Sequence, residues 1–85
     1  MSPAPLLLAE LPNGAPARVA ALRGGGGAVD AAVLQRLAEL GFIPGEPVRV
    51  LRRGPGGREP IAVLVAQTQF ALRLLEARCI EVTPA

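Results

Sequence analysis

The chain has 85 residues, and 51% of them are hydrophobic, so it can bury a core and is expected to fold. Only 2% are aromatic, so aliphatic side chains must fill most of that core. The net charge of +2 is too small to predict an anionic partner by itself. All basic residues are Arg, and the absence of His, Lys and Tyr removes most of the usual catalytic groups. We therefore expect no catalytic residues and no enzyme.

The single cysteine, Cys79, cannot form an internal disulfide, and its place in an apolar stretch predicts a buried structural thiol. No stretch approaches the roughly 20 apolar residues that a membrane helix requires. The first residues have neither the positive charge nor the apolar length of a secretory signal. We therefore expect a cytoplasmic protein.

The first part of the chain predicts a short apolar segment over 6–11, a turn at 12–14 and a strand over 17–22. Four glycines at 24–27 follow. Glycine-rich loops can hold phosphates, but the Lys-Ser or Lys-Thr pair and the later acidic residue of such motifs are missing. This segment is interpreted as a connecting loop.

A helix over 30–40 is the clearest predicted element. Its apolar residues recur at helical spacing: Val33, Leu34, Leu37 and Leu40. Asp30 is a suitable N-cap. Gly41 suits the left-handed position just after the helix, and Phe42 is then expected to fold back near Leu37.

The rest of the chain predicts short strands and turns, then one helical turn and a last strand. The strands are 47–53, 61–66, 69–72 and 80–82, the turns are 54–57 and 67–68, and the helical turn is 74–78. The strands 47–53 and 61–66 are close enough to pair as a hairpin. This order of elements favours a small, strongly bent β-barrel.

Residues 37–45, Leu-Ala-Glu-Leu-Gly-Phe-Ile-Pro-Gly, resemble the L-x-x-L-G-hydrophobic-x-P-G signature of FeoA-type proteins, the small cytoplasmic partners of bacterial ferrous iron transporters. Residues 59–61 are similar to the end of that family's P-x-G-D-P-I hairpin, with Glu in place of the commoner Asp. Residues 70–77 resemble its hydrophobic-A-L-R-x-x-E-A segment. The opening L-x-x-L-x-x-G and the closing I-x-V strand also match, so the resemblance covers about 6–83.

This resemblance implies a mostly β fold with short helices, an SH3-like small β-barrel, and a single FeoA-like domain over 1–85. It also implies association with a FeoB-type ferrous iron transporter through that transporter's cytoplasmic GTP-binding domain. The membrane would then be reached only through the partner. A related barrel in iron-dependent repressors supplies the alternative, a transition-metal-binding or metal-responsive domain.

The expected protein-binding surface combines the connector after the helix with two residues of the 70–77 segment. The candidates are Leu37, Leu40, Gly41, Phe42, Ile43, Pro44, Gly45, Arg73 and Glu76. Core packing is the alternative interpretation for Leu37, Leu40 and Phe42, and it is the better one for Leu37. Phe42 and Ile43 are expected to be partly exposed and to serve as anchors. For Arg73 and Glu76, a surface ion pair at i, i+3 is at least as good an interpretation.

The sequence supports two other binding functions less well, metal binding and nucleic-acid binding. A metal site would have to use carboxylates, because the chain has no His and one Cys; they are Glu39, Glu46, Glu59, Glu76 and Glu81. We therefore expect no cofactor and no metal site. Four arginines of the hairpin are a possible nucleic-acid footprint: Arg49, Arg52, Arg53 and Arg58. The aromatic residues on which bases stack are missing, so no nucleic acid is expected.

Overall fold

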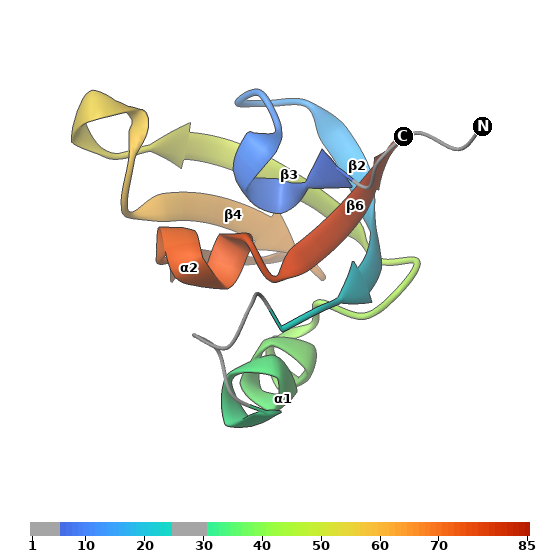
Figure 1. Cartoon of the computed structure of the whole chain (residues 1–85). Coiled ribbons are helices and arrows are strands. Elements are labelled where there is room, and N and C mark those ends of the chain that lie inside the picture. The colour runs from blue at the N-terminus through green and yellow to red at the C-terminus, as the bar shows by residue number, and fades with distance from the viewer. Residues whose placement is uncertain (1–5, 25–30) are drawn as a thin grey trace.

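The computed structural model describes residues 6–24 and 31–85. Within them, six antiparallel strands form one sheet in the order β1-β6-β2-β3-β4-β5 (Figure 1). The strands are β1 (Leu6–Leu7), β2 (Pro16–Leu22), β3 (Pro47–Arg53), β4 (Ile61–Val65), β5 (Thr68–Leu72) and β6 (Ile80–Pro84). The helices are η1 (Leu8–Glu10), α1 (Ala31–Leu40), η2 (Pro55–Gly57) and α2 (Leu74–Ala77), of which η1 and η2 are 3-10 helices.

The sheet bends into a small barrel. Its register shifts in β2 between Val19 and Ala21, and in β3 between Val50 and Arg52. Such bulges increase the bend and twist of a strand. The two edges are brought near each other, because α2, which follows edge strand β5, packs against η1, which follows edge strand β1. The predicted barrel of short strands with short helices is confirmed.

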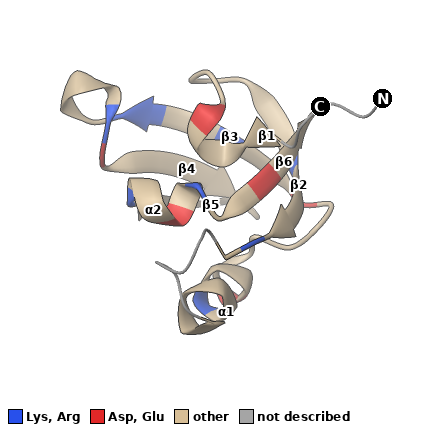
Figure 2. Cartoon of the chain, viewed as in Figure 1, with Lys and Arg blue, Asp and Glu red and all other residues tan. Residues whose placement is uncertain are grey.

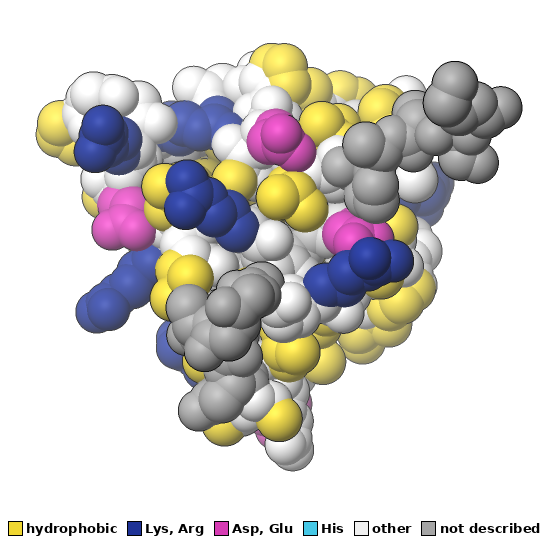
Figure 3. All heavy atoms as spheres, viewed as in Figure 1, with side chains coloured by type: hydrophobic (Ala, Val, Ile, Leu, Met, Phe, Trp, Pro, Cys, Tyr) yellow, Lys and Arg dark blue, Asp and Glu magenta, His cyan; other side chains and the backbone are white. Residues whose placement is uncertain are grey.

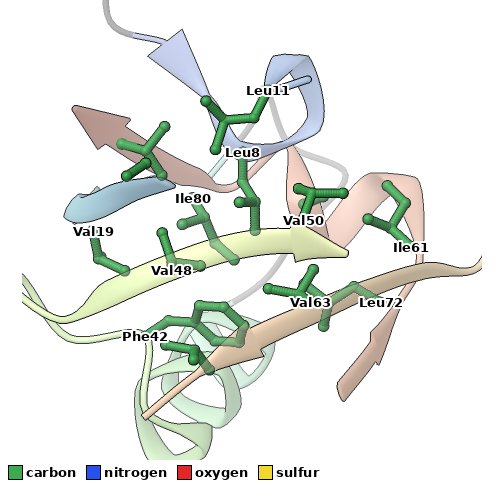
Figure 4. Close-up of a cluster of buried hydrophobic side chains, with 14 of the residues drawn as sticks. Leu8, Leu11, Val19, Phe42, Val48, Val50, Ile61, Val63, Leu72 and Ile80 are labelled. Carbon is green, nitrogen blue, oxygen red and sulfur yellow. The ribbon is translucent and has the colours of Figure 1, made fainter. Parts of the chain in front are cut away.

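The core is built from side chains at alternate positions of the strands, which point to the inner face of the sheet. In β4, Ile61, Val63 and Val65 are buried, whereas the residues between them are half-buried on the other face. These side chains meet buried residues of η1, β2, β3 and β6 in one cluster (Figure 4). Cys79 is buried in it, and its thiol lies 3.3 Å from the carbonyl oxygen of Leu75, so the predicted structural thiol is confirmed.

The hairpin between β4 and β5 differs from its prediction. The expected turn at Gln67-Thr68 is wrong, because Thr68 already pairs with Val65 and the turn residues are Ala66 and Gln67. Both have positive φ, 49° and 65°, as the commonest two-residue hairpin turn requires. Neither is the Gly, Asn or Asp that usually marks this turn, so the pattern of residues lacked the signal.

The predicted end of α1 is confirmed. Gly41 has φ +118° and donates its N–H to Ala38 at 3.1 Å, while Phe42 donates to the carbonyl of Leu37 at 3.1 Å. These two bonds satisfy carbonyls of the last helical turn and reverse the chain. The predicted N-cap at Asp30 and most of the predicted glycine loop lie outside the described residues.

Arg53, at the end of β3, holds the segment after β1 in place. Its Nη2 donates to the carbonyl oxygens of Ala9 and Leu11, both at 2.8 Å, and its Nη1 donates to Oδ1 of Asn13. One guanidinium therefore satisfies two carbonyls and fixes a loop that has no ladder of its own. Arg53 thus has a structural role, which weakens the interpretation of the hairpin arginines as a nucleic-acid footprint.

We predict that Arg53→Met lowers the free energy of unfolding by about 1–3 kcal/mol, because it leaves these acceptors without their charged donor. Arg52→Met is the matched control. Arg52 is exposed and its side chain has no hydrogen bond or ion pair within 6–24 and 31–85, so its change should stay within about 0.5 kcal/mol. Urea unfolding of both variants measures the difference, and equal losses would contradict the structural role of Arg53.

Candidate interaction surface

The connector after α1 is fixed to β2 by backbone hydrogen bonds. Val19 donates to Glu46 O at 2.9 Å and accepts from the Gly45 N–H at 2.8 Å. Nη1 of Arg18 adds a bond of 3.0 Å to the Gly45 carbonyl, and Glu46 donates to Ile43 O at 3.0 Å. The connector is therefore a rigid turn on the side of the barrel.

Within this turn, adjacent residues have opposite environments. Phe42 is 0% exposed, whereas Ile43 is 51% exposed. The prediction of partial exposure is thus wrong for Phe42 and confirmed for Ile43. The physical reason is the bond from Phe42 to Leu37, which turns the ring into the core (Figure 4), where its centroid lies 6.3 Å from that of Phe70.

The other candidates near the connector fall into two groups. Leu37 is fully buried, which confirms its interpretation as a core residue, and Leu40 and Gly41 are half-buried. Three candidates are exposed, and we call them the corner: Ile43, Pro44 and Gly45. In the described structure, only this part of the connector is fully open to a partner.

The expected ion pair between Arg73 and Glu76 is wrong. Glu76 Oε1 instead accepts the backbone N–H of Arg73 at 2.8 Å, and its Oε2 lies 3.4 Å from Nη1 of Arg36. The reason is that Arg73 is the N-cap of α2, where a Glu three residues on bonds back to the cap N–H. Glu76 consequently links α2 to α1, and the guanidinium of Arg73 extends into solvent.

A hollow of about 460 Å³ separates α1 from α2. It is lined by Val33, Arg36, Ala71, Arg73, Leu75 and Glu76. Leu75, which the sequence reasoning missed, is 44% exposed there; with Ile43 it is one of two large hydrophobic side chains exposed among the described residues. A signal existed, because adjacent Leu74 and Leu75 cannot both face the core from a helix of one turn.

The view in Figure 3 shows one face of the molecule, on which hydrophobic side chains form small groups between charged ones. No large apolar patch is visible on this face.

Metal donors are dispersed in the part of the chain that the structure describes. There, no three side chains of His, Cys, Asp or Glu gather at one place. Glu81, the buried carboxylate, pairs with Arg23 at 2.6 Å, and the Cys79 thiol is bonded to a carbonyl. This donor set does not fit a tight transition-metal site. The same residues contain no helix long and apolar enough to cross a membrane.

The barrel belongs to the SH3-like class. FeoA of Stenotrophomonas maltophilia in complex with zinc, described as an SH3-domain protein, matches with a TM-score of 0.80 and 41% identity over 92% of this chain and 89% of that chain. The chain belongs to the FeoA domain family, whose model matches residues 6–84. Membership of this family of small transport-associated domains implies a role in ferrous iron transport.

Two further structures extend the comparison. FeoA of Chlorobium tepidum matches with a TM-score of 0.78 and 34% identity, over 93% of this chain and 70% of that chain. A manganese-dependent transcriptional repressor matches at 0.77 and 25% identity, over 98% of this chain but 44% of the repressor. The same barrel thus forms part of a longer regulator. A search of curated protein sequences found no match.

We predict that Phe42→Ala lowers the free energy of unfolding by about 3–5 kcal/mol, because it removes a fully buried ring. Ile43→Ala should change it by about 0.5 kcal/mol or less, since half of that side chain is already in solvent. Urea unfolding of the two variants checks the opposite environments of these neighbours. Similar losses at both positions would contradict the described connector.

Proposed function

We propose that this protein is a cytoplasmic accessory module of bacterial ferrous iron uptake, and that it acts by binding and not by catalysis. Its partner is the cytoplasmic GTP-binding domain of a FeoB-type transporter, and the whole chain acts as one FeoA-like domain. The observation that carries the proposal is the exposed Ile43 on a turn fixed to β2, in a chain of the FeoA family. The related Stenotrophomonas protein is itself described as a candidate ferrous iron transport activating factor.

The proposed docking surface consists of the corner and the hollow, at the two ends of α1. Ile43 follows the C-terminal end of this helix, and Leu75 lies with Val33 at its first turns. Both anchors sit on ordered backbone, so little conformational entropy is lost when they bind. Covering the exposed half of such a side chain contributes about 1 kcal/mol.

Polar groups around Ile43 and Leu75 determine how the partner is oriented when it binds. Arg73 lines the hollow, and its side chain has no hydrogen bond or ion pair within 6–24 and 31–85, so it is available to a carboxylate of the partner. The pair between Arg36 and Glu76 keeps α1 and α2 together. Such rim charges affect orientation and association rate more than affinity.

The module can change the activity of the transporter only if it binds one nucleotide state of the transporter more tightly than the other. The module shifts the nucleotide state of its partner by the ratio of its affinities for the GDP-bound and GTP-bound forms, and by no more. Binding measured with both nucleotides therefore distinguishes a regulator from a module that only assembles the transporter.

We predict that Ile43→Ser and Leu75→Ser each weaken binding to the purified GTP-binding domain by about fivefold, the equivalent of about 1 kcal/mol. Calorimetric titration measures the affinities, and circular dichroism shows that the variants are folded. Leu7→Ser is the matched control, because Leu7 is a half-buried leucine on β1 that lines neither the corner nor the hollow. Wild-type affinity of both test variants would refute the proposed surface.

The likeness to the manganese-dependent repressor favours a second candidate, a transition-metal-binding or metal-responsive domain. The dispersed donors are the reason why we place it second. We predict that calorimetric titration with Mn²⁺, Zn²⁺ and, without oxygen, Fe²⁺ shows no saturable binding in the micromolar range. A stoichiometric micromolar site would replace the accessory role with the metal-responsive one.

A further inference from the structure

The outer face of the barrel carries a row of side chains that crosses four strands. Residues directly opposite each other in neighbouring strands point to the same face of a sheet. Pro16 of β2 lies opposite Arg49 of β3, Arg49 opposite Leu64 of β4, and Leu64 opposite Gln69 of β5. Since the residues on either side of Arg49 and Leu64 are buried, this row faces away from the core.

An open groove of about 710 Å³ follows part of this row. Its apolar lining includes Pro16, Pro47, Leu64 and Ala66, and its charged lining residues are Arg18, Arg49 and Glu46. The two prolines have no backbone N–H, so they add apolar surface without a donor. The groove thus combines apolar residues with charged ones, two of which are arginines.

The two arginines are diagonal neighbours in the sheet. Arg49 is opposite Pro16, and Arg18 is two residues further along β2. Such diagonal positions lie about 7–8 Å apart. This distance is close to the roughly 6.6–6.8 Å between alternate residues of an extended strand. Carboxylates at positions i and i+2 of an extended segment can therefore reach both guanidinium groups.

The two arginine side chains of the groove lie in no ion pair within the described part of the chain. Arg49 is exposed, and its side chain has no hydrogen bond or ion pair in the described part of the chain, while the side chain of Arg18 has a single hydrogen bond, to the Gly45 carbonyl. Glu46 and the last residue of the sequence, Ala85, also line the groove, and neither lies in an ion pair with the two arginines. The strands β3, β4 and β5 contain no acidic residue, as Figure 2 shows for β3 and β4.

We propose that this groove binds an extended acidic peptide segment of a partner protein, with carboxylates at alternate residues on Arg18 and Arg49. Apolar side chains at the next alternate positions, on the same face of the segment, contact Leu64 and Pro47. A concave apolar floor suits a peptide better than a flat membrane surface. The proposal goes beyond the accessory role, because it assigns a second surface with its own ligand chemistry. It holds for any partner that carries such a segment.

The test uses the full chain and a fluorescein-labelled peptide, Gly-Val-Ser-Glu-Ser-Glu-Ser-Val-Gly, in which both Glu and both Val side chains lie on one face of the extended segment. Binding is followed by fluorescence anisotropy. The same peptide with Gln in place of both Glu is the ligand control. We expect saturable binding of the Glu peptide that weakens with added salt, and binding of the Gln peptide that is about tenfold weaker. Equal binding of both peptides, or no binding of the Glu peptide, would overturn the proposal.

Arginine variants of the chain test whether the Glu peptide binds in the groove. Arg49→Gln and Arg18→Gln should each weaken binding of the Glu peptide by about threefold, and the double variant by about tenfold. Arg78→Gln removes the same charge from an exposed residue that does not line the groove, and it should leave affinity unchanged. A loss with Arg78→Gln equal to that with Arg49→Gln would show non-specific attraction and would refute the site.

Two further measurements distinguish peptide binding in the groove from nucleic-acid binding and from binding at the surface around Ile43. A single-stranded oligonucleotide of equal charge should fail to displace the peptide, and efficient displacement would assign the groove to nucleic acid and refute our proposal. Ile43→Ser should keep wild-type peptide affinity. Peptide binding without any binding to the GTP-binding domain would refute only the proposed partner, whereas the reverse would refute only the acidic-segment groove.

Discussion

The burial of Phe42 is the contact on which the arrangement of the candidate surface depends. The chain has two phenylalanines and no other aromatic residue, and their rings lie 6.3 Å apart between the connector and β5. Because Phe42 reaches the core from the residue after Gly41, α1 must end there and lie under the barrel, as Figure 1 shows. The next residue, Ile43, is then directed to solvent, on backbone that β2 holds in place. One buried ring thus positions both the helix and the exposed anchor.

Arginine has several different roles in this molecule, although composition treats all nine as equal. Arg53 satisfies loop carbonyls, and Arg23 and Arg36 pair with carboxylates of distant elements. Arg49 extends over an apolar groove without a partner in the described residues. A guanidinium is always charged and offers several donors, so it serves structure or recognition according to its neighbours. The net charge of the chain therefore says little about its ligands, and the position of each arginine says more.

Local rules predicted much of the fold. The strand 47–53 has the observed bounds, and the end of the helix at Leu40 follows from Gly41, whose left-handed conformation costs little without a Cβ. The same rules failed at the β4–β5 turn, where strand pairing forces positive φ on two residues that do not favour it. For the site, sequence reasoning identified the connector but chose one wrong anchor and missed Leu75. It also could not pair Glu76 with Arg36, which lies 40 residues away in the chain.

The sequence by itself determined most of the elements, their order, the family and the aliphatic character of the core, because these depend on residue types and on spacing within a few positions. Only the tertiary structure decided which side of each element faces solvent. The closure of the barrel buried Phe42 and exposed Ile43, and the pairing of β2 with β3 placed two arginines side by side over a groove. Exposure and charge proximity are properties of packed neighbours, and those neighbours come from distant parts of the chain.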